Sequence, residues 1–412
     1  MRGDSSMRYL CLSELYWPYQ GGHVVYLHEV FRRLGRARVI TGTMPAMPRR
    51  QTVDGVEIRR IDLRRWALLR PESIALYANL ARYGLLTALR DKPAAVVAAR
   101  VLPEGLIANL IARTTGIPSV VFAHGEEITT WTHAPDPSHS RSRLGVWKQH
   151  LLWHTYRRCD RIVANSRFTQ GLLHAGQIDP SKVTVVHPGT DPQRFRPQPK
   201  DPDLLARYQL QGKRVLLTVG RLSRRKGQDV TLRALTQIVQ EAPDVVYAIA
   251  GTGDYQAELR ALVRLLGLEK HVRFLGSVAD ELLPSVYNLA DVFVMPNRTL
   301  PESNDVEGFG IVFSEAGACA KPIVAGRSGG ASEAVLDGET GLLVDGACPD
   351  QVAAAVLRLL GDGQLARRLG HNARQRVCRE LTWDHSAAHI QTWIDQTVRP
   401  RNRLAPQPAG SA

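Results

Sequence analysis

The chain has 412 residues and a mass of 45.6 kDa, which predicts two or three domains that each bury a core without disulfide staples. Hydrophobic residues make up 44% and charged residues 22%, a balance that excludes a disordered or fibrous chain. The formal charge of +14 lies entirely in residues 1–200, which hold 29 Lys and Arg against 15 Asp and Glu, whereas residues 201–412 hold 24 of each. A one-sided field of this kind attracts phosphate-bearing partners.

The first half alternates short β-rich runs with longer amphipathic segments. The pattern predicts helices at 23–34, 72–90 and 141–158. Strands are predicted between them at 8–12, 38–41, 56–61, 95–99, 119–123, 161–164 and 183–186.

The second half repeats this alternation, with strands predicted at 215–219, 245–250, 272–275, 292–295, 322–325 and 341–344. Such units favour parallel sheets covered by helices on both faces, so the fold class is α/β with two Rossmann-like domains that face each other across a cleft. The expected division is an N-terminal domain (1–190), a proline-rich linker (191–212), a C-terminal domain (213–382), a final helix (383–398) and a disordered tail (399–412). Ligands are expected at the carboxyl ends of the strands, between the domains.

The location of the protein is predicted from what the chain lacks. No stretch approaches the roughly 18 apolar residues of a membrane-spanning helix, and the N-terminus lacks the order of a secretory signal. The five cysteines lie far apart, with no CxxC pair, which argues for a reducing compartment and against a zinc site or disulfide framework. We therefore expect a cytoplasmic protein.

Two common nucleotide motifs are absent or weak. The run GTGDYQ at 251–256 has Gln256 in place of the third glycine of the dinucleotide fingerprint. The run GRLSRRKGQ at 220–228 has the wrong spacing for a P-loop.

The segment 220–228 nevertheless places cations at the end of a predicted strand. Arg221 and Lys226 precede a helix, and a guanidinium and an ammonium backed by a helix N-terminus are suited to clamp a diphosphate. The alternative is an exposed basic turn, which we expect for Arg224 and Arg225.

A second candidate is EGFGIVFSEA at 307–316. Gly310 lets backbone amides at a helix start approach a phosphate. Glu307 can accept hydrogen bonds from sugar hydroxyls, and Glu315, two turns into the helix, from both hydroxyls of a ribose. Alternatively, Glu307 only complements the helix dipole and Glu315 pairs with a neighbouring arginine.

Two N-terminal positions complete the candidate site. Gly22 stands in a turn between a strand end and a helix, where the backbone can approach a phosphate or sugar. His124 ends the strand SVVFA and can bind a substrate hydroxyl or act as a base; alternatively, it is a structural histidine tied to a carbonyl.

The ordered motifs from residue 9 to 393 resemble those of retaining GT-B glycosyltransferases, the family of sucrose, glycogen and lipid glycosyltransferases. The motifs that carry the resemblance are PYQGG, FAHGEE, ANSRFT, VHPGTD, TVGRLSRRKG, AGTGD, LADVFVMPN, EGFGIVFSEA and GGASEAVLDGETGLLVD. The run DVEGFGIVFSEA most resembles GDP-mannose-dependent phosphatidylinositol mannosyltransferases.

The resemblance implies roles for the two domains and for individual residues. The N-terminal domain is expected to bind the acceptor and the C-terminal domain the nucleotide sugar, with the helix at 383–398 returning to the N-domain. The same resemblance implies that Arg221 and Lys226 bind the diphosphate, Glu307 the donor sugar and Glu315 the ribose. The remaining roles that it implies are phosphate contact at Gly22, a position beside the reacting sugar for His124, amide contacts at Phe309, Gly310 and Ile311, and base contacts near Gly276–Val278.

The resemblance also implies the reaction. We expect a hexose, preferably mannose, to move from GDP-mannose to a lipid-linked or glycan acceptor with retention and by front-face transfer, since no carboxylate stands out as a nucleophile. Arg221, Lys226 and a helix start can stabilise the leaving diphosphate, so we expect neither metal nor cofactor; the single DxD, Asp201–Asp203, is expected to be a turn.

Three other functions stay open at this point. The donor can be a UDP-sugar, or the enzyme can be an epimerase or phosphorylase on the same double fold. Charge alone suggests nucleic acid, but no recognition helix, zinc knuckle or RNA-binding aromatic motif is present, so we expect no nucleic-acid partner.

The basic N-terminal half carries a further prediction. Arginines interleaved with Trp66 and leucines suit an anionic membrane surface that holds a lipid-linked acceptor, which would make the protein peripheral on the inner face. A solvated charged face is the alternative. The residues concerned are Arg32, Arg33, Arg36, Arg38, Arg59, Arg60, Arg64, Arg65 and Arg70, with Ile61, Leu63, Leu68 and Leu69.

Overall fold

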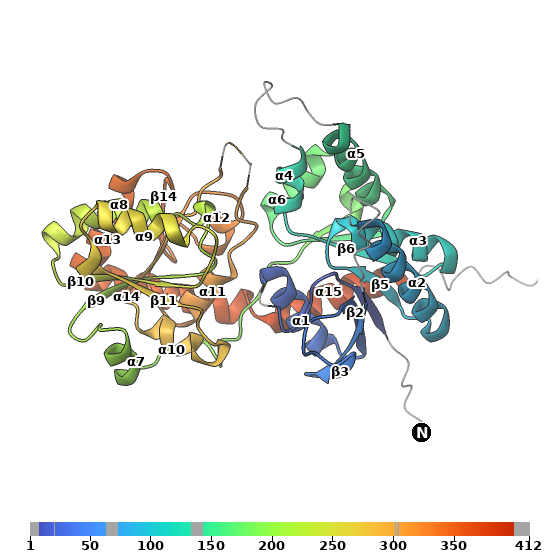
Figure 1. Cartoon of the computed structure of the whole chain (residues 1–412), viewed down its shortest axis with the longest axis horizontal. Coiled ribbons are helices and arrows are strands. Elements are labelled where there is room, and N and C mark those ends of the chain that lie inside the picture. Colours follow the sequence, from blue (N-terminus) through green and yellow to red (C-terminus); the bar gives the residue numbers. More distant parts are fainter. Residues whose placement is uncertain are drawn as a thin grey trace, which may run out of the picture.

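The computed structural model describes residues 8–19, 21–62, 73–132, 143–300, 302 and 305–398. Figure 1 shows two α/β domains side by side, the N-terminal domain in blue to green and the C-terminal domain in yellow to orange. Every strand predicted from the sequence is present, with ends within one residue of those expected. The two-domain α/β prediction is therefore confirmed.

The N-terminal sheet has the strand order β3-β4-β2-β1-β5-β6-β7-β8. All neighbours are parallel except β3, which pairs antiparallel with β4. The sequence prediction missed β3, although Asp54 and Gly55 between the two strands have positive φ and form the tight turn that an Asp-Gly pair favours. The strands are β1 Tyr9–Leu12, β2 Ala37–Gly42, β3 Arg50–Val53, β4 Val56–Ile61, β5 Ala95–Ala98, β6 Ser119–Ala123, β7 Arg161–Ala164 and β8 Val183–Val185.

Helices cover this sheet on both faces, and each face buries its own apolar cluster. The parallel strands read as continuous apolar runs because both faces are buried. The helices are α1 Gly22–Leu34, α2 Ser73–Asp91, α3 Leu106–Thr115, α4 Glu126–Thr132, α5 Arg143–Arg158 and α6 Arg167–Ala175.

The C-terminal sheet is parallel throughout, in the order β11-β10-β9-β12-β13-β14. Its strands are β9 Arg214–Val219, β10 Val245–Ala250, β11 Val272–Gly276, β12 Val292–Met295, β13 Ile323–Gly326 and β14 Leu342–Val344. Its helices are α7 Pro202–Arg207, α8 Gln228–Glu241, α9 Gln256–Leu265, α10 Leu283–Asn288, α11 Ile311–Ala318, α12 Ala331–Ala334, α13 Pro349–Gly361 and α14 Gly363–Glu380.

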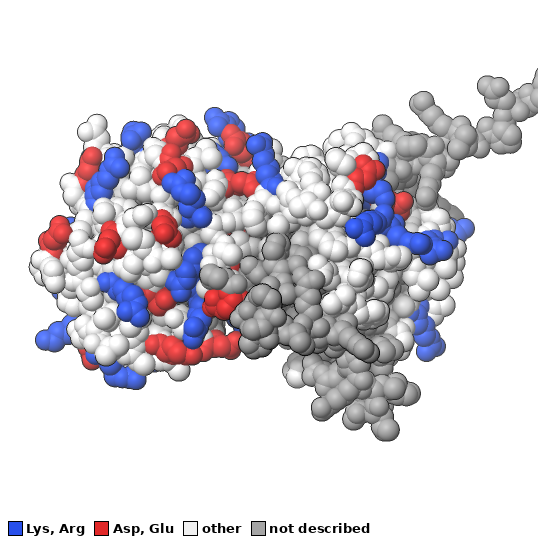
Figure 2. Space-filling model, turned by 90° about the horizontal axis from the view of Figure 1, so that it is seen from above, with Lys and Arg blue, Asp and Glu red and all other residues white. Residues whose placement is uncertain are grey.

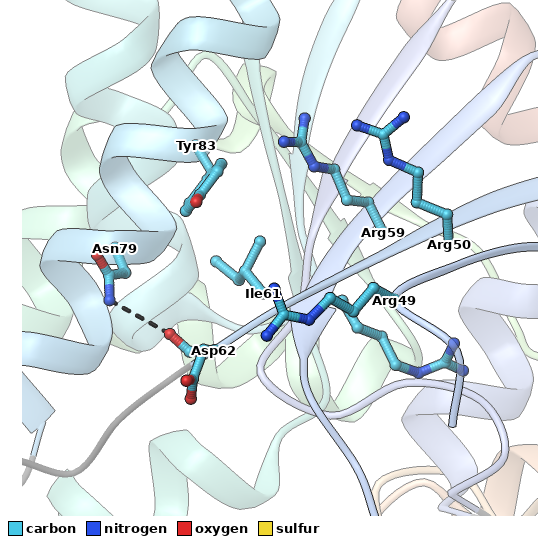
Figure 3. A pocket seen from close by; sticks show the side chains of 8 residues that line it. Arg49, Arg50, Arg59, Ile61, Asp62, Asn79 and Tyr83 are labelled. Atoms are coloured by element: carbon cyan, nitrogen blue, oxygen red, sulfur yellow. Dashed lines mark hydrogen bonds between the residues drawn. The ribbon is translucent and has the colours of Figure 1, made fainter. Parts of the chain in front are cut away.

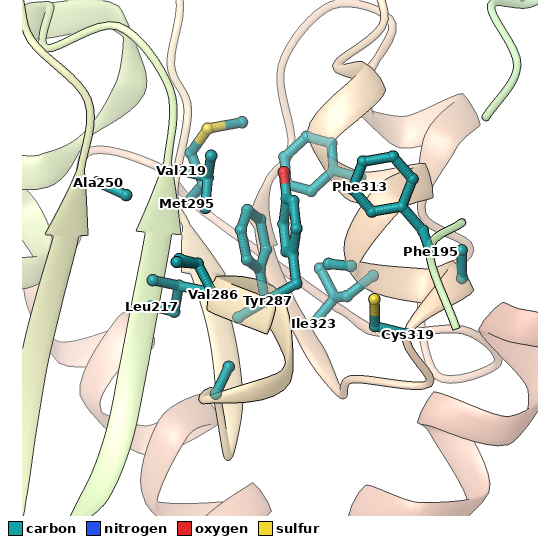
Figure 4. Close-up of a cluster of buried hydrophobic side chains, with 14 of the residues drawn as sticks. Phe195, Leu217, Val219, Ala250, Val286, Tyr287, Met295, Phe313, Cys319 and Ile323 are labelled. Carbon is teal, nitrogen blue, oxygen red and sulfur yellow. The ribbon is translucent and has the colours of Figure 1, made fainter. Parts of the chain in front are cut away.

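The segment 191–212 differs from the linker expected, because part of it belongs to the C-terminal core. Phe195, Leu204 and Leu210 are buried in the same cluster as Tyr287 and Phe313 (Figure 4). The expected turn at Asp201 begins α7, where the Asp201 carboxylate accepts hydrogen bonds from two backbone amides. These three apolar side chains anchor the segment in the core. Their wide spacing gives no periodic pattern, so the sequence did not predict this packing.

The last helix, α15 Trp383–Val398, lies against α1 of the N-terminal domain (Figure 1, red). Trp383, Ile390 and Ile394 are buried in the N-terminal core, and the rings of Trp383 and Tyr26 are 5.8 Å apart. The chain therefore crosses twice between the domains, which ties their positions together. No helix within the described ranges is long and apolar enough to cross a membrane.

Candidate active site between the domains

The carboxyl end of β9 carries the basic turn predicted from the sequence. Lys226 is buried, and its ammonium donates to the Glu307 carboxylate. Burial lowers the pKa of Lys226, while Lys226 and Arg225 together hold the pKa of the buried Glu307 below its usual value against the effect of burial. The cation and the carboxylate thus lie together, 81 residues apart in sequence.

Arg225 is not the solvated residue that we expected. Its guanidinium donates to Glu307 at 2.7 Å and pairs with Asp305 at 2.9 Å, and only 14% of its side chain is exposed. Arg224 is exposed, as predicted, and its guanidinium lies 5.3 Å from the centre of the Tyr255 ring. Arg224 and Arg225 are neighbours in one short helical turn, yet one is exposed and the other is largely buried. A sequence motif does not reveal this difference.

Arg221 occupies a different part of the turn from Lys226. Its side chain is 67% exposed and pairs with the exposed Asp254 at 2.9 Å. Among the described residues, Arg221 and Lys226 share no ion-pair partner. The structure therefore holds Lys226 in place and leaves the Arg221 guanidinium at the surface.

The start of α11 supplies the second group of predicted residues. Gly310 has a φ of +89°, a conformation that glycine adopts without strain, and Phe309 beside it is buried. Glu315 accepts a hydrogen bond from the Tyr287 hydroxyl at 2.6 Å, in place of the arginine pairing considered above. Burial raises the pKa of Glu315 to about 7. Val278, after the end of β11, packs partly buried against the C-terminal core.

The N-terminal domain approaches this turn directly. A Cβ atom on Gly308 would lie 2.3 Å from the His124 carbonyl oxygen, so only glycine fits between the domains there. A Cβ on Gly22 would lie 4.0 Å from Ile311 at the start of α11. The structure thus brings Gly22, His124 and the start of α11 to one interface.

His124 has the structural contact that we named as its alternative. Its Nε2 donates to the Ala99 carbonyl at 2.9 Å, and its own carbonyl accepts from Asn165 at 3.0 Å. The ring lies 5.9 Å from that of His23, which begins α1. These bonds fix the orientation of His124 at the end of β6.

Glu333 on α12 forms a second bridge between the domains. Its carboxylate accepts hydrogen bonds from the backbone amides of Arg167 and Phe168 at 2.8 Å each, at the N-terminus of α6. His187 contacts the same carboxylate at 2.9 Å and stacks on Phe309 with ring centres 5.1 Å apart. The sequence analysis included Glu333 in a motif but gave it no role.

A cluster that the sequence analysis missed lies beside His124. Glu104 is fully buried; one carboxylate oxygen accepts from the Glu14 amide, and burial raises the Glu104 pKa to about 7. Arg100 lies 3.1 Å from the carboxylate of Glu14 and 3.6 Å from that of Glu104. Within the part of the chain that the structure describes, His23 Nε2, Arg100 Nε and Glu104 Oε2 are buried without hydrogen-bond partners.

Native proteins rarely leave such groups unsatisfied, so ordered water or a polar ligand can supply their hydrogen bonds here. The three residues follow β1 or β5, at the same edge of the sheet as His124. A search for polar residues just after predicted strands would have found Glu14 and Arg100. Over the described ranges, no three His, Cys, Asp or Glu side chains gather in a metal-binding arrangement.

Two family models match the chain. The model described as Glycosyltransferase Family 4 matches residues 20–194, and the model described as Glycosyl transferases group 1 matches residues 203–376. Together they cover both domains.

Curated relatives extend this similarity. A GDP-mannose-dependent alpha-(1-6)-phosphatidylinositol monomannoside mannosyltransferase of Mycolicibacterium smegmatis is 36% identical over 292 residues, which cover 70% of this chain and 72% of the relative. A D-inositol 3-phosphate glycosyltransferase of Streptomyces scabiei is 31% identical over 395 residues, which cover 89% of this chain and 84% of the relative.

Solved structures share the fold. A sucrose-phosphate synthase from Thermosynechococcus elongatus has a TM-score of 0.77 at 23% identity and covers 94% of this chain and 98% of its own. The Anabaena HepE protein in complex with UDP has a TM-score of 0.76 at 22% identity, with 95% and 100% covered. The two-domain architecture, the matched models and the relatives above 30% identity lead to one conclusion: this chain is a glycosyltransferase of family 4 with the GT-B fold.

Proposed function

We propose that this glycosyltransferase moves mannose from GDP-mannose to a hydroxyl of a phosphate-bearing polyol acceptor, lipid-linked or part of a glycan. The observation that carries the proposal is the buried Lys226–Glu307 pair at the end of β9, facing the N-terminal domain. Relatives at 36% identity are named as GDP-mannose-dependent mannosyltransferases. The named acceptors of both classes of relatives contain an inositol phosphate.

The C-terminal domain would bind the donor. Lys226 and the exposed guanidinium of Arg221 would contact the diphosphate. The backbone amides after Gly310 would complete the anion site at the start of α11. Glu315 would accept the ribose hydroxyls, while the backbone near Val278 would hold the base.

Catalysis would rest on electrostatic stabilisation of the leaving diphosphate. When the anomeric bond breaks, negative charge develops on GDP and the sugar becomes oxocarbenium-like. Glu307 already binds two cations, so it is suited to orient a sugar hydroxyl rather than to attack carbon. We infer retention by front-face transfer, in which the departing phosphate takes the acceptor proton, with no metal and no cofactor beyond the donor.

The N-terminal domain would bind the acceptor. The unsatisfied atoms of His23, Arg100 and Glu104 offer both donors and acceptors for polyol hydroxyls beside His124. We also propose peripheral contact with an anionic membrane on the cytoplasmic side. Of the basic and apolar residues that suggested this contact, Leu63, Arg64, Arg65, Trp66, Leu68, Leu69 and Arg70 lie outside the described residues.

The proposal is tested by incubating the protein with GDP-mannose or UDP-glucose and either phosphatidylinositol vesicles or myo-inositol 1-phosphate. We expect transfer of mannose from GDP-mannose, with an α-linkage seen by NMR. A β-linked product would contradict retention. Transfer from UDP-glucose alone would show that the donor is a UDP-sugar and not GDP-mannose. Release of an epimerised nucleotide sugar without an acceptor product would show that the enzyme is an epimerase.

A further inference from the structure

A pocket of about 380 Å³ lies at the outer edge of the N-terminal sheet, apart from the site described above. This volume falls within the ~300–1,000 Å³ range of small-molecule sites. The pocket is lined by Arg49, Arg50, Arg59, Arg60, Ile61, Asp62, Asn79 and Tyr83, most of them drawn in Figure 3. We call it the arginine pocket.

The pocket lining has an excess of positive charge. Four arginines and one acidic residue, Asp62, are among the residues that line it. Among the described residues, Arg49, Arg50 and Arg59 form no ion pair with an acidic side chain. By contrast, the nearby Arg38 is paired with both Glu57 and Asp91.

Two of these arginines are held together against their mutual repulsion. Arg50 on β3 and Arg59 on β4 are direct cross-strand partners, an arrangement that destabilises a sheet when the charges are alike. Figure 3 shows their side chains extending side by side, with Tyr83 next to Arg59. The Arg59 guanidinium lies 5.0 Å from the centre of the Tyr83 ring, which limits its movement away from Arg50.

Arg60 also lines the pocket, but the alternation along β4 directs its side chain to the opposite face of the sheet from Arg59. It is only 2% exposed, and its guanidinium donates to the carbonyls of Pro48 and Trp17 and to the Gln51 side chain. All three acceptors are neutral, and among the described residues its Nε has no hydrogen-bond partner. Arg60 is therefore held by neutral acceptors on that face, and Arg50 and Arg59 are the pair positioned to contact an anion in the pocket.

The pocket also lies on the side of the sheet where the acceptor would bind. Ile61 ends β4 at the carboxyl edge, and only β2 separates β4 from β1, whose end carries Glu14; at ~4.8 Å per strand this is about 10 Å. The bond from Arg60 to Trp17 ties the end of β4 to the loop that leads from β1 to Gly22. A ligand could therefore occupy the pocket and reach the interface between the domains.

The C-terminal domain offers a comparison for these charges. Figure 2 shows one face of the molecule, on which blue and red side chains alternate over the C-terminal domain at the left. In the C-terminal domain, Arg214 pairs with Asp244 and Arg327 with Asp337. The arginine pocket thus combines a concave shape with uncompensated cations.

We propose that the arginine pocket binds a phosphate group carried by the acceptor. Guanidiniums recognise phosphate through paired, charge-assisted hydrogen bonds, which suits Arg50 and Arg59 in adjacent positions. The assignment of the phosphate to the acceptor rests on the proposed function. The inference that the pocket binds phosphate is independent of it. The phosphate can come from a lipid headgroup or from a free sugar or cyclitol phosphate.

The test compares Arg50→Ala/Arg59→Ala with Arg113→Ala/Arg233→Ala, a control that removes the same charge from exposed helix positions. Binding of myo-inositol 1-phosphate and of uncharged myo-inositol is measured by calorimetry. Flotation is measured with phosphatidylcholine vesicles that contain or lack phosphatidylinositol. The melting shift produced by GDP is recorded for every variant.

We expect the native protein to bind the phosphate but not myo-inositol, with affinity about tenfold or more weaker in the pocket variant and unchanged in the control. Binding of the soluble phosphate alone assigns a free acceptor, and binding of vesicles alone assigns a lipid headgroup. The phosphate site would be refuted if the native protein bound neither myo-inositol 1-phosphate nor the vesicles, or if both variants lost the same affinity. If the GDP shift persists in that case, the proposed function survives; if GDP has no effect on the native protein, the proposed function fails instead.

Discussion

Glu307 has two basic partners, and their different positions determine what each contributes. Lys226 is buried beneath the carboxylate, whereas Arg225 reaches it from the side and also pairs with Asp305. Buried charges are stable only when all members of such a group are present. The residues of the basic turn are therefore not interchangeable, even though three cations follow one another in sequence.

Removing Arg225 should destabilise the protein, while removing Arg224 should not. Arg225→Ala leaves Glu307 with one buried cation, and we expect a loss of about 2 kcal/mol in the free energy of unfolding. Arg224→Ala removes an exposed side chain from the same turn and should cost less than about 0.5 kcal/mol. Urea denaturation measures both, and equal costs would contradict the environments described here.

Glu315 should make nucleotide binding depend on pH. Burial raises its pKa to about 7, so the free enzyme holds this carboxyl protonated below that pH and ionised above it. Ribose hydroxyls donate best to the ionised form, so GDP affinity should rise as the pH increases from 6 to 8.

The matched variant Glu315→Gln separates this effect from the ionisation of GDP itself. Calorimetric titration of GDP at each pH should give a flatter profile for the variant than for the native protein. Profiles with the same slope would show that Glu315 does not contact the nucleotide.

At the scale of elements, the contact between α12 and α6 is the clearest device that holds the domains together. Glu333 supplies a negative charge to the positive end of a helix in the other domain, and its hydrogen bonds with His187 and the two amides lower its pKa although burial opposes this. This carboxylate is thus one of the contacts that hold the two domains together, besides α15 and the close approach of Gly308 to His124.

Glu333→Gln keeps the shape of the side chain and removes its charge. We expect a loss of about 1 kcal/mol in unfolding free energy and a larger radius of gyration in small-angle scattering, because the domains separate more readily. Glu339→Gln, on an exposed side chain nearby, is the control. An unchanged radius of gyration in the Glu333 variant would refute the bridge.

At the scale of the whole molecule, the sequence predicted the repeated strand and helix units and missed the elements that occur once. Apolar runs and strand-end motifs predicted every parallel strand, because burial on both faces imposes the same composition each time. β3 was missed because its exposed and half-buried residues carry no apolar signal. Phe195, Leu204 and Leu210 were missed for the related reason that they fill the core one at a time.

The candidate site shows the same division. Gly22, His124, Lys226 and the start of α11 could be assembled from motifs, because parallel sheets bring strand ends to one edge. The pairing of Arg225 with Glu307 and the unsatisfied atoms around Glu104 depend on side-chain directions across 80 or more residues. No local pattern contains that information.

The central claim is that a nucleotide sugar binds between the domains with its diphosphate on Lys226. A thermal-shift panel of GDP-mannose, GDP, UDP-glucose and UDP, run on the native protein and on Lys226→Ala, tests it most directly. The account predicts that GDP-mannose and GDP raise the melting temperature of the native protein and that this shift is lost in the variant, with Arg224→Ala retaining it. Absence of a shift with every nucleotide, or an undiminished shift in Lys226→Ala, would contradict it.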